Sequence, residues 1–257
     1  MKQVKYPSGI KAVFFDFMGT CLDWYSGVMK AFPTRLDEHT RRSLSLSWRE
    51  AFFAEIHARF QQGLPVESFD VTNARQLELV LERHAIPLSE SEKVQLVQAW
   101  HHMPAWEHVA ETLVDLKRHG LELFVLANGT TRLQLDLVRS SGLCEFDMLF
   151  SSELLHLAKP DPDFYTSALS LTGYRPEETA MVAAHAYDLR AAGKLGIRTV
   201  YISRWTEDTH EDLRQVYQDV DGFLGSLRGY KYEPDDQETY VMRSLPVALG
   251  LTSPADI

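Results

Sequence analysis

Three charged residues of this chain are of the types that a covalent nucleophilic site needs. Asp16 lies near the end of the apolar run 11–17 (KAVFFDF), Lys159 lies in the segment LAKPDP, and Asp188 lies in MVAAHAYDLRAA. A carboxylate that attacks a substrate must stay ionised, and a nearby ammonium group favours that charged form. Taken singly, each residue is explained as well by a common structural role: an acid that caps a turn, a solvated loop lysine, an acid at a helix N-terminus. A chemical role therefore depends on a fold that brings the three together.

The elements that would position these residues are apolar runs separated by segments of helical length. Continuous apolar runs at 11–17 and 121–127 (LELFVLA) are typical of strands buried on both faces, and shorter runs follow at 148–151, 180–184 and 199–202. Strands that alternate with helices predict an α/β fold with a doubly wound, Rossmann-like parallel sheet. In such sheets ligands bind at the carboxyl edge, where the loops after the strands gather. Asp16 follows the first run and is expected at that edge.

A helical insertion is predicted between the first and second core strands. About 100 residues there have helical periodicity without a strand-like run, most clearly at 43–62, 73–84 and 89–100. We therefore expect a helical cap over 24–104 and a core over 1–23 and 105–257. Further helices are expected at 105–119 and 132–140, and the tail after Leu224 is expected to be irregular and packed on the surface.

Composition restricts the partners. A net charge of −10 and the lack of a Lys/Arg stripe argue against nucleic acid, and no apolar run approaches the roughly 20 residues of a membrane span. Cys21 and Cys144 have no metal-ligand spacing, and no export signal precedes the first strand. We expect a cytoplasmic protein that acts on a small molecule.

The chain resembles the haloacid dehalogenase superfamily on motifs that occur in the family's order. These are Asp16-Phe-Met-Gly-Thr followed by Leu22-Asp23, then Lys159, then the segment that contains Asp188. The resemblance extends to about Arg204. It implies that Asp16 is a covalent nucleophile and that Lys159 holds its carboxylate.

Two departures separate the chain from the magnesium-dependent phosphatases of that superfamily. Met18 occupies the position of their general acid and cannot transfer a proton, and Ala184 occupies the position of an acid that supports the metal. We expect neither a metal nor another cofactor.

Several residues resemble the L-2-haloacid dehalogenase branch. They are Arg49 in a Trp-Arg pair of the first long insertion helix, Asn128 after the second strand, Thr20 and Tyr165. Three of them also have an ordinary explanation: Arg49 could form a surface ion pair, Asn128 could initiate a turn, and Tyr165 could be a core aromatic. Tyr187 occupies the position of a bulky pocket aromatic in that branch.

Other positions do not match that branch. Ala127, Ala183 and Ala184 replace serines, and His185 replaces an asparagine three residues before Asp188. A histidine there has a pKa suited to proton transfer and could activate water, or it could only hydrogen-bond Asp16 or Lys159. These changes put the substrate in question more than the nucleophile.

The resemblance implies metal-independent hydrolytic dehalogenation of a short 2-haloacid through an ester on Asp16, and a homodimer. Thr20 and Lys159 would hold the carboxylate, Asp188 or His185 would activate water, and the substrate or halide would meet Arg49, Asn128, Tyr187, Tyr165 and Met18. The alternatives are a hydrolytic or lyase-like reaction on another small substrate, a magnesium phosphatase, and a non-catalytic binding protein that uses the tail after Leu224.

Overall fold

The computed structural model describes residues 9–65, 67–227 and 238–252. The chain separates into an α/β unit, made of Met1–Leu22, Ala105–Thr131 and Gly142–Ile257, and a helical unit, made of Asp23–Pro104 and Arg132–Ser141. The division predicted from the sequence places Asp23 and 132–141 in the core, whereas both group with the helical unit.

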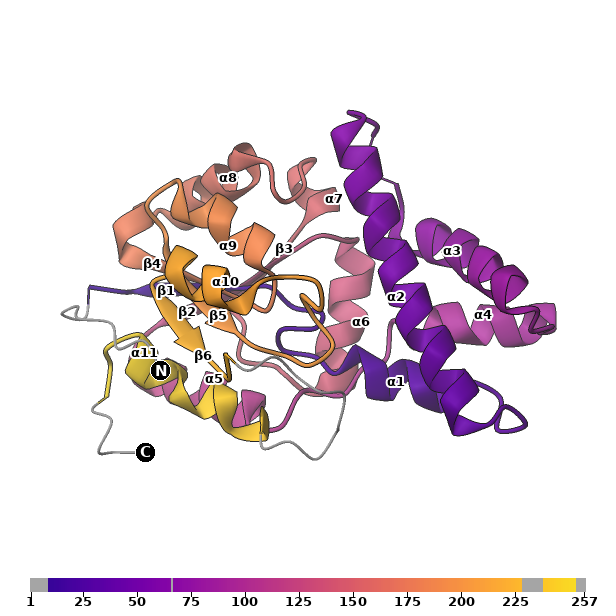
Figure 1. Ribbon diagram of the computed structural model, residues 1–257. Coiled ribbons are helices and arrows are strands. Elements are labelled where there is room, and N and C mark those ends of the chain that lie inside the picture. The colour runs from indigo at the N-terminus through magenta and orange to yellow at the C-terminus, as the bar shows by residue number, and fades with distance from the viewer. Residues whose placement is uncertain (1–8, 66, 228–237, 253–257) are drawn as a thin grey trace. The chain divides into compact units, whose positions relative to one another are not determined.

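Six strands form one parallel sheet in the order β3-β2-β1-β4-β5-β6 (Figure 1). They are β1 (Ala12–Phe15), β2 (Glu122–Ala127), β3 (Met148–Ser151), β4 (Thr179–Ala183), β5 (Arg198–Ile202) and β6 (Gly222–Leu224). The predicted doubly wound sheet is confirmed. Strand order reverses at β1, and the crevice beside such a reversal is where ligands bind in these folds.

Helices cover both faces of the sheet. On one face lie α8 (Pro162–Thr172) and α9 (Ala186–Gly193), and on the other lies α5 (Val109–Arg118) (Figure 1). Under α8 and α9 the rings of Phe14, Phe124 and Phe150 pack with centroids 5.3–6.4 Å apart. The strands can therefore be apolar on both sides, which accounts for their continuous apolar runs. The shorter helices are α7 (Ser152–Leu155) and α10 (Leu213–Asp219).

The expectation of an irregular tail after Leu224 is wrong for the part of the tail that the structure describes. Glu238–Ser244 forms a 3₁₀ helix and Leu245–Ala248 forms α11, and both contact α5 and β6. Met242, Leu245 and Leu249 are buried. Residues 228–237, which include much of the polar stretch, lie outside the described residues. Strand β6 was not predicted, because three residues give too short a pattern to detect.

The helical unit is built from α1 (Trp24–Ala31), α2 (Glu38–Gln61), α3 (Phe69–His84), α4 (Glu90–Ala99) and most of α6 (Thr131–Ser141). The predicted helices are confirmed, and α1 is an addition. Side-chain caps fix several helix starts, including a capping box at Ser89 and Glu92. The core of the helical unit is aromatic. The ring of Trp24 stacks on that of Trp100 with centroids 5.6 Å apart, and the ring of Trp48 meets that of Trp100 edge-on with centroids 5.1 Å apart. Within the described residues, no helix is both long and apolar enough to cross a membrane.

Candidate active site

A buried ionic cluster lies where β1 and β4 end. Asp16 directly follows β1, and its backbone N–H donates to the carbonyl of Val182 in β4 at 2.9 Å. His185 is the N-cap of α9, and Asp188 lies in the first turn of that helix. All three residues are more than nine-tenths buried. The sheet topology thus brings together residues that are far apart in the sequence.

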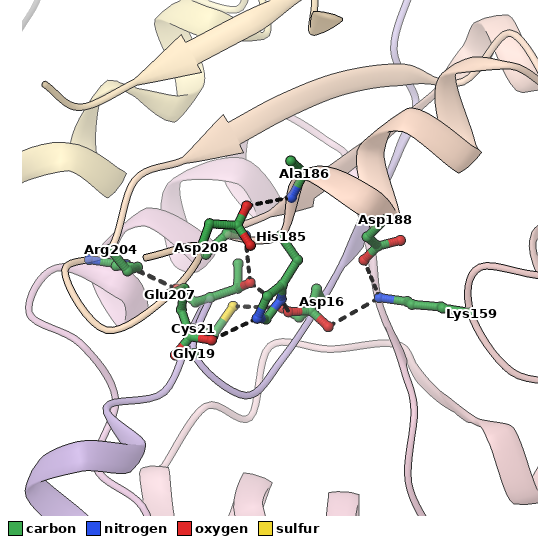
Figure 2. Close-up of polar contacts among 12 residues, drawn as sticks. Asp16, Gly19, Cys21, Lys159, His185, Ala186, Asp188, Arg204, Glu207 and Asp208 are labelled. Atoms are coloured by element: carbon green, nitrogen blue, oxygen red, sulfur yellow. Dashed lines mark hydrogen bonds and ion pairs between the residues drawn. The ribbon is translucent and has the colours of Figure 1, made fainter. Parts of the chain in front are cut away.

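The two carboxylate oxygens of Asp16 have different neighbours. Figure 2 shows the carboxylate between His185 on one side and Lys159 on the other. Oδ1 lies 3.1 Å from Lys159 Nζ, while Oδ2 lies 3.0 Å from His185 Nδ1 and accepts a 2.6 Å hydrogen bond from the Thr20 hydroxyl. Thr20 Oγ1 in turn accepts from the backbone N–H of Ala184 at 2.8 Å. Three side chains therefore hold the carboxylate in one orientation.

Lys159 connects the two aspartates. Its Nζ forms ion pairs with both Asp16 and Asp188, and the other oxygen of Asp188 accepts a 2.7 Å hydrogen bond from the Tyr165 hydroxyl. The main chain of Lys159 is held by Asn128, whose Oδ1 accepts from the Lys159 N–H at 2.8 Å and whose Nδ2 donates to the Lys159 carbonyl at 3.2 Å. Asn128 therefore fixes the loop that delivers the lysine.

His185 lies between two carboxylates. Its Nε2 is 2.7 Å from Oε2 of Glu207, on the opposite side of the ring from Asp16. Glu207 follows β5, is buried, and has its other oxygen hydrogen-bonded by Thr206 Oγ1 at 3.0 Å. The next residue, Asp208, accepts from the N–H of Ala186 at 2.7 Å and so satisfies the start of α9. One loop thus supplies both a partner for the imidazole and a cap for its helix.

The electrostatic balance favours an ionised Asp16. Burial by itself raises the pKa of Asp16, but the charges of Lys159 and His185 and the hydrogen bonds from His185 and Thr20 hold that pKa far below its usual range. Burial lowers the pKa of His185, yet Asp16 and Glu207 outweigh it and raise that pKa to about 10. The ring is therefore an imidazolium at neutral pH, a form in which both nitrogens are donors.

The pKa values of Asp188 and Lys159 are both raised, for different reasons. Burial raises the pKa of Asp188, and Lys159 opposes that rise only in part. For Lys159, the loss of solvation on burial is outweighed by the two aspartates, and the pKa is raised. Asp188 is therefore better suited than Asp16 to accept a proton, while Lys159 stays charged.

The comparisons with known proteins agree with this geometry. The family model of the haloacid dehalogenase-like hydrolases matches residues 10–196. This chain belongs to that family. The match includes β1 to β4, α9 and the whole helical unit, and therefore every residue of the site except Thr206, Glu207 and Asp208 in the loop after β5.

Several curated relatives of this haloacid dehalogenase-like hydrolase are named as dehalogenases. It is 30% identical over 198 residues to the (S)-2-haloacid dehalogenase 4A of Burkholderia cepacia, covering 76% of this chain and 84% of that protein. It is also 30% identical over 196 residues to the (S)-2-haloacid dehalogenase 1 of Pseudomonas sp. (strain CBS-3), covering 76% and 85%. Among solved structures, an L-2-haloacid dehalogenase superposes with a TM-score of 0.73 at 29% identity, covering 85% of this chain and 95% of that one.

Most of the residues singled out from the sequence lie together in the α/β unit. Asp16, Thr20, Lys159, Tyr165, His185 and Asp188 form one hydrogen-bonded network. The ring of Tyr187 lies 5.9 Å from that of His185, and Met18 lies in the turn after β1, bridged to Leu22.

Arg49 belongs to the helical unit and is described there. It is buried on α2, with its guanidinium 4.3 Å from the ring centre of Phe53, 5.2 Å from Trp24 and 5.7 Å from Trp100. Aromatic faces attract a cation, so these contacts help to stabilise a charge away from water. The surface ion pair considered from the sequence does not fit this burial.

Glu207 is the site residue that sequence reasoning missed. It lies in the loop after β5, at the same edge of the sheet as Asp16. Its position after a predicted strand could therefore have identified it as a candidate site residue. Over the parts of the chain that the structure describes, no group of three His, Cys, Asp or Glu side chains has the arrangement of a metal site.

Proposed function

We propose that this protein is a hydrolytic dehalogenase that converts short 2-haloacids to 2-hydroxyacids without a metal, through an ester on Asp16. The observation that carries the proposal is a buried Asp16 carboxylate kept ionised by Lys159, Thr20 and His185, with Met18 in place of a phosphatase's general acid. Such a carboxylate is a nucleophile for a polarised carbon. Met18 cannot supply the proton that the leaving group of a phosphate ester requires.

In the first step an oxygen of Asp16 attacks the carbon that bears the halogen. The carbon–halogen bond breaks with its electron pair, halide leaves, and an ester remains with inverted configuration at the carbon. Arg49, Asn128 and Tyr187 are assigned to the departing halide, and Met18 and Tyr165 to the substrate pocket, from their sequence matches. The helical unit is assigned the role of the cap, which excludes water while a poorly hydrated carboxylate attacks.

In the second step water attacks the ester carbonyl of Asp16 and releases the 2-hydroxyacid. Of the two bases considered from the sequence, Asp188 fits better, because burial raises its pKa. His185 already carries its proton near neutral pH, since Asp16 and Glu207 raise its pKa to about 10. A protonated imidazole cannot take a proton from water.

The names of the relatives support the substrate class. Two (S)-2-haloacid dehalogenases share 30% identity with this chain over three-quarters of its length. The (S) configuration in those names points to L-2-chloropropionate as the first substrate to test.

The test is halide release from L-2-chloropropionate and from chloroacetate in the presence of EDTA, beside an Asp16→Asn variant. We expect release by the wild type and a loss of about 10⁴-fold or more in the variant, because removing the nucleophile leaves only binding and orientation. In single turnover in water labelled with heavy oxygen, the label should enter Asp16. Wild-type activity in the variant, or no release from either acid, would contradict the proposal.

Two further expectations accompany this function. A cytoplasmic location and a homodimer remain predictions, to be checked by cell fractionation and by size-exclusion chromatography with light scattering.

A further inference from the structure

The two oxygens of the Asp16 carboxylate have different numbers of hydrogen-bond donors. Oδ2 has two donors, the Thr20 hydroxyl at 2.6 Å and the His185 ring at 3.0 Å, whereas Oδ1 has the Lys159 ammonium at 3.1 Å. The oxygen with fewer donors keeps more of its lone-pair density for attack, because each accepted hydrogen bond withdraws density from its acceptor. This asymmetry distinguishes the attacking oxygen from the other one.

We propose that Asp16 attacks through Oδ1, that Thr20 and His185 form an oxyanion hole for Oδ2 when the ester is hydrolysed, and that Glu207 is the positioning residue of His185. The inference rests on the proposed function and assigns a separate role to each oxygen of Asp16. Thr20 and His185 would touch a reacting atom, whereas Glu207 would act only through the imidazole.

The bond changes of the hydrolysis step follow from this assignment. Water oxygen bonds to the Asp16 carbonyl carbon, one water proton passes to Asp188, and the carbonyl π pair moves onto Oδ2 as an oxyanion. The pair then returns to form the carbonyl, and the bond from carbon to Oδ1 breaks. Oδ1 leaves with the product and takes the second water proton as its hydroxyl. Asp16 is restored as a carboxylate that contains the oxygen of water, and Asp188 returns its proton to solvent.

The placement of Glu207 fits a dedicated support for the imidazolium. Its side chain is almost completely buried, and Thr206 holds the oxygen that does not contact His185. It packs so closely on Gly19 that a Cβ there would lie 2.5 Å from Glu207 Cδ. With φ at +85°, Gly19 also has a backbone conformation that favours glycine. The loop after β1 is thus shaped to admit this carboxylate.

The charges around His185 are consistent with a ring that stays protonated. Asp16 and Glu207 face its two nitrogens directly, Asp208 is a further, partly buried acid within its electrostatic reach, and Lys159 lies beyond Asp16. Burial lowers the pKa of the ring, but Asp16 and Glu207 outweigh that loss of solvation and raise the pKa to about 10. A carboxylate on each nitrogen requires both to be donors, which only the imidazolium provides.

The two chemical steps should respond differently to the loss of this cation. During ester formation negative charge leaves Asp16, so donors on its carboxylate stabilise the starting state. During hydrolysis negative charge develops on Oδ2, so the same donors stabilise the transition state. Weakening the imidazolium should slow hydrolysis and spare halide release.

The experiment compares wild type, Glu207→Gln and the exposed control Glu177→Gln, which removes one charge from a surface ion pair with Arg175. Each is mixed with L-2-chloropropionate, and halide release and intact protein mass are followed. For Glu207→Gln we expect a rapid burst of about one halide per site, accumulation of the ester mass, and steady-state turnover lower by roughly 10²-fold. The alkaline limb of its pH profile should move to lower pH by about 1–3 units, because one counter-charge of the imidazolium is gone. The control should match wild type.

A second variant keeps the test decisive if Glu207→Gln does not fold. His185→Asn introduces the residue that the related branch has at this position, and it should lose the alkaline limb altogether. Adding Glu207→Gln to His185→Asn should then have no further effect on turnover.

The outcomes separate the two proposals. Wild-type turnover with no burst or ester in Glu207→Gln, an unmoved pH limb, or an additive effect in the double variant overturns the inference alone. Absence of halide release from wild type removes the proposed function and this inference with it.

Discussion

Ion pairs in the two units differ in how much water surrounds them. In the α/β unit, Lys159 and Asp188 have side chains no more than 1% exposed and pair directly. In the helical unit, Arg75 bridges Glu55 and Glu67 at 2.7 and 2.8 Å with side chains 23–39% exposed. Both sets of charges are in direct contact, but only the buried ones lose their solvation and depend on one another. Burial, rather than the presence of a short contact, determines what an ion pair contributes.

The largest effect is expected from removing the buried cation. Lys159→Met leaves two buried carboxylates without their shared ammonium, which should destabilise the protein by about 3–5 kcal/mol. Dehalogenation should fall by about 10³-fold or more, because Asp16 loses one of the two charges that keep it ionised. Urea unfolding followed by circular dichroism measures the first and halide release the second. A stability equal to that of wild type would mean that solvent reaches the site.

A pH titration should produce the next largest effect, and with opposite signs in the two units. The pKa of His185 is raised from 6.5 to about 10, so its stabilising contribution is fully present below pH 6.5 and is lost as pH rises through about 10. The loss should be on the order of a few kcal/mol in the free energy of unfolding. Urea titrations at pH 7 and at pH 10.5 should reveal it, and His185→Asn should show a smaller decline over the same interval.

The smallest effect is expected at the exposed network. Arg75→Met should lower the free energy of unfolding by about 1 kcal/mol or less at low salt, and by less at high salt. Its pH dependence runs the other way: hydrogen bonds from Arg75 and Thr72 lower the pKa of Glu67 from 4.5 to about 2, so this contribution disappears as pH falls through that range. A loss comparable to that of Lys159→Met would contradict the comparison between the units.

The strands could be predicted from the sequence because they are buried on both faces. That burial requires continuous apolar runs, and such runs are visible at β1, β2 and β4 without any structure. The same runs end in Asp16 and, after β2, in Asn128, so the carboxyl edge of the sheet could be assigned residue by residue. Strand β6 and the buried helices of the tail could not, because their segments are too short for a periodic pattern.

Sequence alone singled out Asp16 and Lys159, because motif order along the chain preserves the order of strand ends. Only the tertiary structure decided that His185 lies between Asp16 and Glu207, since 22 residues separate the histidine from the glutamate and their contact depends on neighbouring β4 and β5. It likewise decided that Asn128 holds the main chain of Lys159. Charge states in a buried cluster depend on every group that shares the low-dielectric space, and a linear sequence does not specify which groups those are.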